Sequence, residues 1–369
     1  MQILCVDVGT GTQDVLLFDA EREIENCVQL IVPSPTQIVA GQIRQATVAG
    51  RDVLLTGRTM GGGPCAWAAE EQIRRGYRVY ATVEAALTFD DELAKVERMG
   101  VQIVADDEAG RLSDVVRVVM GDLDLEAIGA AIERFGVTFT PAAVAVAVFD
   151  HGNAPPGVSD RVFRFDYIAE TVVQNDFTAF AYRREAIPDR LTRMRSAASV
   201  VPTGVAALVM DTAPAAVLGA LEDPLVRREE CSLIANLGNF HTLAFHLSNG
   251  QIVGLFEHHT GELSLAKLER YLGQLAAGTI SNAEVFADMG HGALVVRPTE
   301  QLPRFLAVTG PRRGLLADSA LHPYQAVPHG DMMLAGCFGL LRAMARKYPE
   351  YREAIEARLG PELRWGTRE

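Results

Sequence analysis

An apolar segment near the start of the chain ends in an acidic residue and a turn that could bind an anion. Asp7 closes the apolar run and precedes a turn of small and polar residues: Gly9, Thr10, Gly11, Thr12 and Gln13. Glycine permits positive φ angles and close backbone approach, so the amides of such a turn can converge on phosphate oxygens. The carboxylate of Asp7 offers the oxygen ligands that Mg²⁺ prefers. A single copy of this pattern fits an ordinary Gly-Thr hairpin equally well.

The pattern recurs later in the chain. Residues 3–19, ILCVDVGTGTQDVLLFD, align without gaps with 232–248, SLIANLGNFHTLAFHLS, which puts Asn236 at the position of Asp7. The second turn supplies further phosphate-binding candidates: Gly238, Asn239, His241 and Thr242. His241 takes the position of Thr12 and can be either structural or a phosphate contact. Two copies in register predict a duplicated nucleotide-binding core built from β-hairpins.

These two segments resemble the first and second phosphate motifs of the actin, sugar-kinase and Hsp70 ATPase superfamily. The segment 306–316, LAVTGPRRGLL, is similar to the adenosine motif of the superfamily, and 144–152, VAVAVFDHG, occupies the place of its connecting motif. The four motifs follow the expected order over nearly the whole chain. The resemblance implies an α/β fold of the two-domain actin-like ATPase (ribonuclease-H-like) type, with duplicated β-hairpin phosphate loops and an interdomain cleft.

The resemblance also implies ATP and Mg²⁺ as cofactors. The nucleoside would lie at a strand-to-helix turn whose second residue begins the helix; this turn consists of Gly310, Pro311, Arg312 and Arg313. Asp150 stands at the strand end where many kinases of the superfamily carry the carboxylate that activates the attacking hydroxyl, so Asp7 and Asp150 are the catalytic candidates. Asp150 fits the alternative role of capping the following turn equally well.

More narrowly, the chain looks like a member of an uncharacterised branch, a domain of unknown function often labelled pyruvate formate-lyase activating enzyme. Four segments carry this resemblance: GRTMGGGPCAWA, EHHTGEL, DMGHGA and VTGPRRGLL. A radical-SAM activase needs three closely spaced thiolates for its iron–sulfur cluster, whereas the five cysteines here are scattered singly. We therefore expect no iron–sulfur cluster and no radical-SAM activity. Isolated cysteines in odd number also favour a reducing cytoplasmic location.

Histidines and acidic residues form a second unusual set. His258 and His259 follow an apolar strand, while Asp288 and His291 sit in a glycine-bounded turn. Imidazole and carboxylate can bind a transition metal, and a histidine can also act as a base near neutral pH. Because adjacent strand residues point to opposite faces, at most one of His258 and His259 is expected to share a site with His291. A metal site and a polar substrate site without metal both stay open.

Three consecutive glycines, Gly61, Gly62 and Gly63, precede Pro64, which fits the first position of a helix. Unpaired amides and the helix dipole attract negative charge at such a position. The turn can therefore receive a substrate carboxylate or phosphate in the first-domain half of the cleft. A loop needed only for tight strand-to-helix packing explains the glycines equally well.

Overall composition restricts the classes of partner. The 369 residues are 49% hydrophobic and carry a net charge of −13, which is unfavourable for binding a nucleic-acid backbone. The longest apolar stretch, near 141–149, is far shorter than the roughly 20 residues of a membrane helix, and the N-terminal segment lacks a basic signal region. We expect a small-molecule substrate or a protein partner, no nucleic acid and no membrane, with homo-oligomers left open.

Strand and helix signals alternate along the first part of the chain, which predicts a parallel or mixed sheet covered by helices. The expected divisions are a first actin-like domain with inserted α/β elements at 1–155, a hinge or accessory region at 156–230, and a second actin-like domain at 231–369. The middle range mixes aromatic and basic residues less regularly, and we interpret it as helices with a loop.

Two classes of function follow from these expectations. The first is a Mg²⁺-dependent ATPase or small-molecule phosphotransferase that works by cleft closure. The second is a nucleotide-gated binding module with little turnover, which Asn236 favours because an amide supplies no charge to Mg²⁺ and cannot act as a base. A third alternative is a metal-dependent enzyme that uses the turns of His258, His259 and His291.

Overall fold

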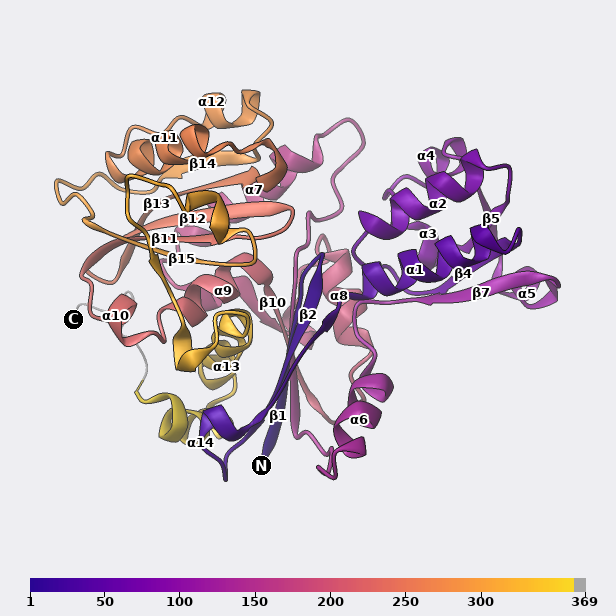
Figure 1. Ribbon diagram of the computed structural model, residues 1–369, viewed down its shortest axis with the longest axis horizontal. Coiled ribbons are helices and arrows are strands. Elements are labelled where there is room, and N and C mark those ends of the chain that lie inside the picture. The colour runs from indigo at the N-terminus through magenta and orange to yellow at the C-terminus, as the bar shows by residue number, and fades with distance from the viewer. Residues whose placement is uncertain (362–369) are drawn as a thin grey trace.

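The computed structural model describes residues 1–361 of the 369-residue chain. Within these described residues, the strands form two six-stranded sheets and one four-stranded sheet. Figure 1 shows the four-stranded sheet and its helices as a lobe that projects from the rest of the molecule. The lobe consists of residues 35–120, so it is an insertion between strands of the first six-stranded sheet.

The first sheet has the order β3-β2-β1-β8-β10-β9. The strands β1, β2 and β3 form an antiparallel meander, and β8 and β10 extend the sheet parallel to β1. Every residue of β8 is buried, which explains its uninterrupted apolar sequence. The strand bounds are β1 (Gln2–Val8), β2 (Thr12–Asp19), β3 (Val28–Pro33), β8 (Ala143–Val148), β9 (Ala181–Arg183) and β10 (Ala206–Asp211).

The second sheet repeats this pattern in the order β14-β13-β12-β11-β15-β16. An antiparallel meander is again followed by parallel strands on the other side of the first strand. Asp7 pairs with Asp14 across the first hairpin and Asn236 with Leu243 across the second, so the sequence repeat is kept in register. The strand bounds are β11 (Cys231–Leu237), β12 (His241–Ser248), β13 (Gln251–His259), β14 (Gly292–Val295), β15 (Phe305–Thr309) and β16 (Tyr324–Gln325).

We call the part of the molecule built on the first six-stranded sheet the first half and the part built on the second six-stranded sheet the second half. Two helices cross tightly where these halves join. α9 (Thr212–Ala220) is buried at every position after its first residue, and α13 (Ala335–Lys347) packs on α9 and on the first sheet. Gly219 and Gly339 lie at the crossing, where an added Cβ would collide with the backbone of the facing helix. Glycine at both positions therefore allows the two backbones to approach this closely.

The lobe contains a parallel sheet of order β6-β5-β4-β7, and its buried apolar side chains form a cluster separate from the main core. β5 and β7 lie on opposite sides of β4, so the strand order reverses beside β4. In open parallel sheets, ligands bind at the carboxyl ends of the strands at such a reversal. The elements are α1 (Pro35–Val48), β4 (Asp52–Gly57), α2 (Pro64–Arg74), β5 (Val79–Thr82), α3 (Val83–Ala86), α4 (Leu93–Arg98), β6 (Val101–Val104), α5 (Asp106–Arg111) and β7 (Val115–Met120).

The remaining helices flank the sheets. The α-helices are α6 (Leu125–Arg134), α7 (Asp160–Val172), α8 (Thr192–Ser199), α10 (Pro224–Arg227), α11 (Leu265–Ala276), α12 (Asn282–Ala287) and α14 (Pro349–Leu359). The 3₁₀ helices are η1 (Ile24–Asn26), η2 (Phe177–Phe180), η3 (Arg184–Ala186), η4 (Thr260–Glu262), η5 (Arg313–Leu316) and η6 (Pro328–Gly330). Within residues 1–361, no helix has the length and apolar character needed to cross a membrane.

A buried arginine links the two large sheets. Arg164 of α7 is fully buried and forms ion pairs with Asp211, at the end of β10, and with Glu257 in β13. Its Nη2 atom donates to Asp211 Oδ1 and to Glu257 Oε1, each at 3.0 Å. Because the two carboxylates belong to different sheets, these two ion pairs fix the first half against the second.

The predicted two-domain actin-like fold is confirmed by the two sheets of matching topology. The limits 1–155, 156–230 and 231–369 stay a prediction as domain boundaries. Two observations bear on them: β9 and β10, inside the predicted hinge region, complete the first sheet, and α13, near the end of the chain, packs against that sheet.

Candidate functional site

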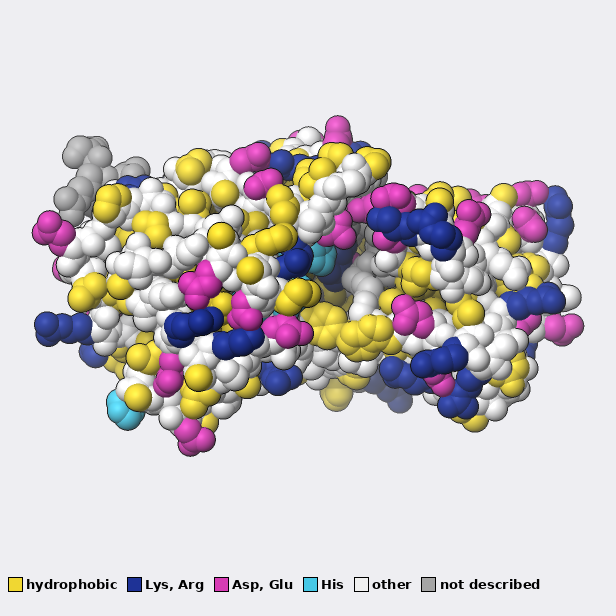
Figure 2. Space-filling view, turned by 90° about the horizontal axis from the view of Figure 1, so that it is seen from above, with side chains coloured by type: hydrophobic (Ala, Val, Ile, Leu, Met, Phe, Trp, Pro, Cys, Tyr) yellow, Lys and Arg dark blue, Asp and Glu magenta, His cyan; other side chains and the backbone are white. Residues whose placement is uncertain are grey.

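A cavity of about 450 Å³ lies where the two halves and the lobe meet. Figure 2 shows a hollow between the main body and the lobe, with histidine side chains (cyan) visible on its inner wall. The volume falls within the range of small-molecule pockets, roughly 300–1,000 Å³. The predicted site residues that line the cavity are Asp7, Gly9, Thr10, Thr12, Gly61, Gly62, Gly63, Asp150, Gly238, Asn239, His241 and Pro311.

The two hairpin turns have the same geometry. The Gly9 amide donates to the Thr12 carbonyl at 2.9 Å, and the Gly238 amide donates to the His241 carbonyl, also at 2.9 Å. An added Cβ would lie 3.0 Å from the carbonyl oxygen in the first turn and 2.8 Å from it in the second, so both turns favour glycine. The structure thus places two equivalent turns at one cavity.

Some turn residues have structural roles instead. Gln13 is buried, and its Nε2 atom donates to a carbonyl of β3 at 3.2 Å. Thr242 is also buried, and its hydroxyl shares a 3.0 Å hydrogen bond with a threonine of η4. The turns approach each other closely, because a Cβ on Gly11 would lie 2.5 Å from Asn239 Nδ2. Gln13 and Thr242 therefore support the turns from behind, outside the cavity lining.

Two carboxylates face each other across the first hairpin. Asp7 Oδ1 accepts a hydrogen bond from Thr212 at 2.5 Å, whereas Asp14 Oδ1 is buried with no hydrogen-bond partner within residues 1–361. Burial raises the pKa of Asp7 to about 6, and burial together with the charge of Asp7 raises the pKa of Asp14 to about 8. A nearby cation would favour the charged forms of both groups.

This pair of carboxylates fits the Mg²⁺ ion that the fold family implies. Mg²⁺ takes oxygen ligands, keeps several of its waters and is commonly bound by one or two carboxylates. Asp7 and Asp14 both line the cavity, and the unpartnered oxygen of Asp14 is available as a ligand. Asp14 was not predicted as a site residue, although its position on the strand paired with Asp7 was a usable signal.

The glycine loop between β4 and α2 faces the hairpins. Gly63 precedes α2 with φ 66°, and the Gly61 amide donates to Asp122 Oδ1 at 3.1 Å. Asp122 is held in turn by the guanidinium of Arg193. A Cβ on Gly63 would lie 2.8 Å from the ring of Phe240, which stands in the second hairpin turn. The predicted substrate loop and the predicted phosphate loops are therefore adjacent.

Asp150 has the geometry of the turn-capping alternative. Its Oδ1 atom accepts the Gly152 amide at 2.8 Å, and its Oδ2 atom accepts the Met194 amide at 2.9 Å. The side chain is buried, and burial raises its pKa. A general base needs an oxygen within reach of the proton that it removes. With both oxygens engaged, Asp150 is better suited to holding the loop that follows β8.

The predicted helix start at Pro311 is wrong. A turn at 310–312 leads into the four-residue helix η5, which begins at Arg313. Gly310 has φ 95° and packs against Leu237, whose carbonyl accepts the Arg312 amide at 2.9 Å, so the chain bends back toward β11. The Arg313 guanidinium bonds the Gly310 carbonyl at 3.2 Å. Of the four predicted nucleoside residues, Pro311 alone lines the cavity.

Histidines from four separate segments meet beside the second hairpin. His151 follows β8, His241 begins β12, His259 ends β13 and His291 precedes β14. The ring centroid of His291 lies 4.7 Å from that of His259, 5.0 Å from that of His241 and 5.8 Å from that of His151. His151 was not predicted; its place directly after Asp150, at the end of a buried strand, was the signal that could have found it.

The other two predicted metal candidates lie elsewhere. His258 points to the opposite face of β13, where its Nε2 atom lies 3.5 Å from Asp288 Oδ2. Asp288 also accepts a 2.6 Å hydrogen bond from Lys267. The structure thus brings His259, and not His258, beside His291, as expected for adjacent residues of a strand.

Burial favours the neutral form of three of the clustered histidines, His151, His241 and His291. Burial lowers the pKa of His291 to about 2, with a further contribution from neighbouring His259. Burial and then the charge of His291 hold the pKa values of His151 and His241 well below the ordinary value of 6.5. Phe149 stacks on His241 with ring centroids 3.9 Å apart. Each neutral imidazole keeps one ring nitrogen with a free lone pair.

Residues 60–315 match the family described as "Putative pyruvate format-lyase activating enzyme (DUF1786)". The matched range contains most of the lobe, the second hairpin and the four histidine segments. Within residues 1–361, no three cysteines lie close enough to share a metal; the group that does meet this condition consists of His151, His241 and His291.

Among curated proteins, none matches this sequence. The chain is similar to the Lmo2764 protein, "a putative N-acetylmannosamine kinase", from Listeria monocytogenes, with 11% identity, 94% of this chain and 99% of that chain covered, and a TM-score of 0.34. The ethanolamine utilization protein EutJ from Carboxydothermus hydrogenoformans has 14% identity, coverage of 92% and 89%, and a TM-score of 0.29. A "putative sugar kinase" from Cytophaga hutchinsonii has 13% identity, coverage of 92% and 98%, and a TM-score of 0.30. Likenesses this distant carry no functional argument.

Proposed function

The chain belongs to the DUF1786 family, and we propose that it binds ATP with Mg²⁺ in its cleft and acts as an ATPase or small-molecule phosphotransferase. The observation that carries this proposal is the pair of hairpin turns with the same register and the same turn hydrogen bond, both at one cavity. Glycine-rich turns on two walls of a cleft can hold a polyphosphate between them through their amides.

The first hairpin would carry the metal. Asp7 and Asp14 would hold Mg²⁺, which supplies positive charge to the phosphate oxygens during phosphoryl transfer. Thr10 and Thr12 would donate from the first turn to the phosphates, opposite Gly238 of the second turn. Phosphoryl transfer depends mainly on positioning and charge stabilisation, so turns and carboxylates suffice for the protein's part.

The acceptor would bind at the glycine loop 61–63 of the lobe. This loop lies at the carboxyl end of β4, beside the reversal in strand order, and its last residue precedes α2. The reversal in strand order favours ligand binding at this place, and the helix dipole favours an anionic group on that ligand. A small carboxylated or phosphorylated compound that carries a hydroxyl group fits this position.

Cleft closure would protect the reaction from water. The Phe240 ring in the second hairpin turn lies 5.5 Å from the Trp67 ring on α2, so the second half already touches the lobe. Phe240 also contacts Gly63, next to the proposed acceptor position. Movement of the lobe would open and close this contact and thereby control access of water and substrate.

A nucleotide-gated module with little turnover is the second candidate. Asn236 stands where the first half has Asp7, so the second hairpin lacks a carboxylate at this position. The side chain of Asn239 also fills the space in front of Gly11. The missing carboxylate favours little turnover, in which case the closed state itself would be the signal for a partner.

Calorimetry with ATP and Mg²⁺ tests the nucleotide site. We expect the wild type to bind and Asp7→Asn to bind at least about tenfold more weakly, which corresponds to about 1.4 kcal/mol. Asp107→Asn is the control, because that carboxylate is exposed on α5 and pairs with Arg111. No binding by the wild type, or equal binding by Asp7→Asn, would contradict the proposal.

ADP formation in the same samples separates the two candidates. An enzyme releases ADP, and a phosphotransferase does so faster when a small hydroxy acid or a phosphorylated hydroxy compound is added. A binding module retains nucleotide with little ADP. Stimulation that persists unchanged after Gly62→Val would show that the acceptor does not bind at the glycine loop.

A further inference from the structure

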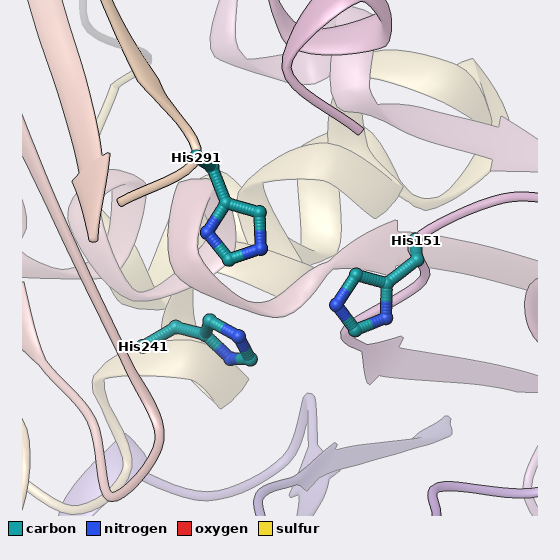
Figure 3. Close-up of side chains that lie close together, drawn as sticks. All are labelled: His151, His241 and His291. Carbon is teal, nitrogen blue, oxygen red and sulfur yellow. The ribbon is translucent and has the colours of Figure 1, made fainter. Parts of the chain in front are cut away.

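The histidine cluster is not explained by nucleotide binding. Figure 3 shows His151, His241 and His291 with their rings directed toward one another from three separate segments. One ring nitrogen from each lies within 4.8 Å of the other two. We propose that His151, His241 and His291 form a binding site for a divalent transition-metal ion of the Zn²⁺ type.

The distances suit such an ion after small side-chain rotations. Zn²⁺ binds histidine nitrogen at about 2.0–2.1 Å in tetrahedral geometry, which puts the ligand nitrogens about 3.3–3.5 Å apart. The three rings lie 5.0 to 5.8 Å apart between centroids, so they surround a common point without packing on each other. Three histidines and one open position are the ligand set of a catalytic zinc site.

Several ring nitrogens of this cluster are buried without a hydrogen-bond partner among the described residues. Both ring nitrogens of His291 and the Nε2 atom of His241 are buried with no hydrogen-bond partner in the described range 1–361. His291 is 1% exposed. Buried polar atoms are normally satisfied, because leaving one unpaired costs roughly 1–3 kcal/mol. A metal ion would use lone pairs that the protein leaves free.

The surrounding groups fit a dication. Glu257 Oε2 lies 3.9 Å from His291 Nδ1, on the side where a carboxylate commonly orients a metal-binding imidazole. Arg164 pairs with both Asp211 and Glu257, so this buried group combines two carboxyl groups with one guanidinium. His259 Nδ1 lies 2.7 Å from the carbonyl of Met289, which holds this fourth ring beside the site.

The ligand type argues for a transition metal rather than a second Mg²⁺. Neutral imidazole suits Zn²⁺, Ni²⁺, Cu²⁺ and Fe²⁺, whereas Mg²⁺ prefers carboxylate, carbonyl and water oxygens. The first hairpin has those oxygens in Asp7 and Asp14, and the second half has nitrogens at the corresponding wall. The two sites would therefore select different metals.

The position of the ion gives it a role in the cleft. His151 and His241 line the cavity, so the open coordination position faces bound ligand and could take an anionic oxygen of a phosphate or carboxylate. His151 belongs to the first half, and His241 and His291 belong to the second half. Metal bound by all three ties the halves together at the floor of the cleft.

Zinc binding to the full chain without nucleotide tests the site. Protein stripped with a chelator is titrated with Zn²⁺ in competition with a chromophoric chelator, and Co²⁺ absorption reports tetrahedral nitrogen coordination. We expect one ion per chain in the wild type. His151→Gln and His291→Gln should each weaken Zn²⁺ binding at least about tenfold. Loss of a residue that binds the metal directly should lower the metal affinity more than loss of a residue that only supports such a ligand.

His258→Gln is the matched control, because His258 adjoins His259 on β13 but points to the opposite face. It should retain wild-type affinity. Circular dichroism checks that each variant is folded, and His151→Gln, on a partly exposed loop, keeps the test valid if His291→Gln fails to fold. Absence of stoichiometric Zn²⁺ in the wild type, or an equal loss in His258→Gln, overturns the proposal. Asp7→Asn should still bind Zn²⁺, so failure of the nucleotide site and failure of this site are distinguishable.

Discussion

The two hairpins share one backbone and differ in chemistry. Each has the same turn hydrogen bond and register, but the first pairs Asp7 with Asp14, while the second pairs Asn236 with Leu243 and carries His241 at its turn. The first hairpin therefore offers carboxylate oxygens as metal ligands, and the second offers the ring nitrogen of a histidine. The comparison teaches that a duplicated frame fixes where ligands can bind, while single side chains decide which ligands they are.

The strands next to the hairpins differ in the same way. β8 in the first half leads to a loop with Asp150 and His151, whereas β15, its counterpart in the second half, leads to the turn of Gly310 and Pro311. The first loop places the imidazole of His151 beside His241 and His291 of the second half. The second turn packs back on β11 and presents a proline to the cavity.

Breaking the link between the halves should have the largest effect. Arg164→Met leaves Asp211 and Glu257 buried without their cation, so we expect a loss of about 3–5 kcal/mol in the free energy of unfolding. Chemical denaturation followed by circular dichroism measures it. Arg190→Met is the control, because its ion pair with Glu170 is partly exposed and should contribute about 0–1 kcal/mol. Equal losses in the two variants would mean that Arg164 does not join the halves.

A substitution that crowds the Asp7 carboxylate should have the second-largest effect. A Cβ on Gly336, at the start of α13, would collide with Asp7 Oδ2, so Gly336→Ala should displace that carboxylate and weaken Mg²⁺–ATP binding about tenfold. Gly273→Ala on α11 is the matched control, since a Cβ there meets nothing within 4 Å. The control should bind normally and be more stable by about 0.5–1 kcal/mol. Calorimetry and thermal unfolding measure the two effects, and normal binding by Gly336→Ala would remove Asp7 from the metal site.

Making the second hairpin more like the first should sharpen the comparison. Asn236 is half-buried at the cavity, so Asn236→Asp can add a carboxylate opposite Asp7. If the missing charge limits turnover, ADP formation should rise about tenfold, equivalent to about 1.4 kcal/mol in the barrier. Asn249→Asp, in the turn after β12, controls for the added charge alone. Unchanged ADP formation would indicate that the second hairpin only positions phosphate.

The smallest effect concerns the acidic rim of the lobe. Burial and then the charge of Asp160 raise the pKa of Asp91 to about 6, with Asp150 and Asp90 adding to the shift and Lys95 opposing it. Because the native state then holds the proton more tightly than the unfolded state, stability falls as pH rises from about 4 to 6. Asp91→Asn should therefore melt about 1–2 °C above the wild type at pH 7.5, and the difference should shrink at pH 5. If the difference in melting temperature between Asp91→Asn and the wild type does not depend on pH, the pKa of Asp91 is not raised in the folded protein.

The sequence by itself determined the frame. The apolar strands, the glycine turns and the repeat of 3–19 at 232–248 are local patterns, so the two hairpins and the alternating helices could be predicted from them. Strand alternation also predicted that only one of two adjacent histidines would approach His291. The prediction that a helix starts at Pro311 was wrong. Contacts of Gly310 with β11 outweigh the preference of proline for the first position of a helix.

Only the tertiary structure decided what the site contains. His151, His241 and His291 are far apart in the chain. They meet because the first half, which carries His151, packs against the second half, which carries His241 and His291. Whether Asp150 caps a turn, or Asp14 lacks a partner, depends on neighbours that no local pattern specifies. Local sequence sets backbone geometry through steric and hydrogen-bond preferences, whereas the chemistry of a cleft depends on burial and on contacts between distant segments, which exist only once the chain has packed.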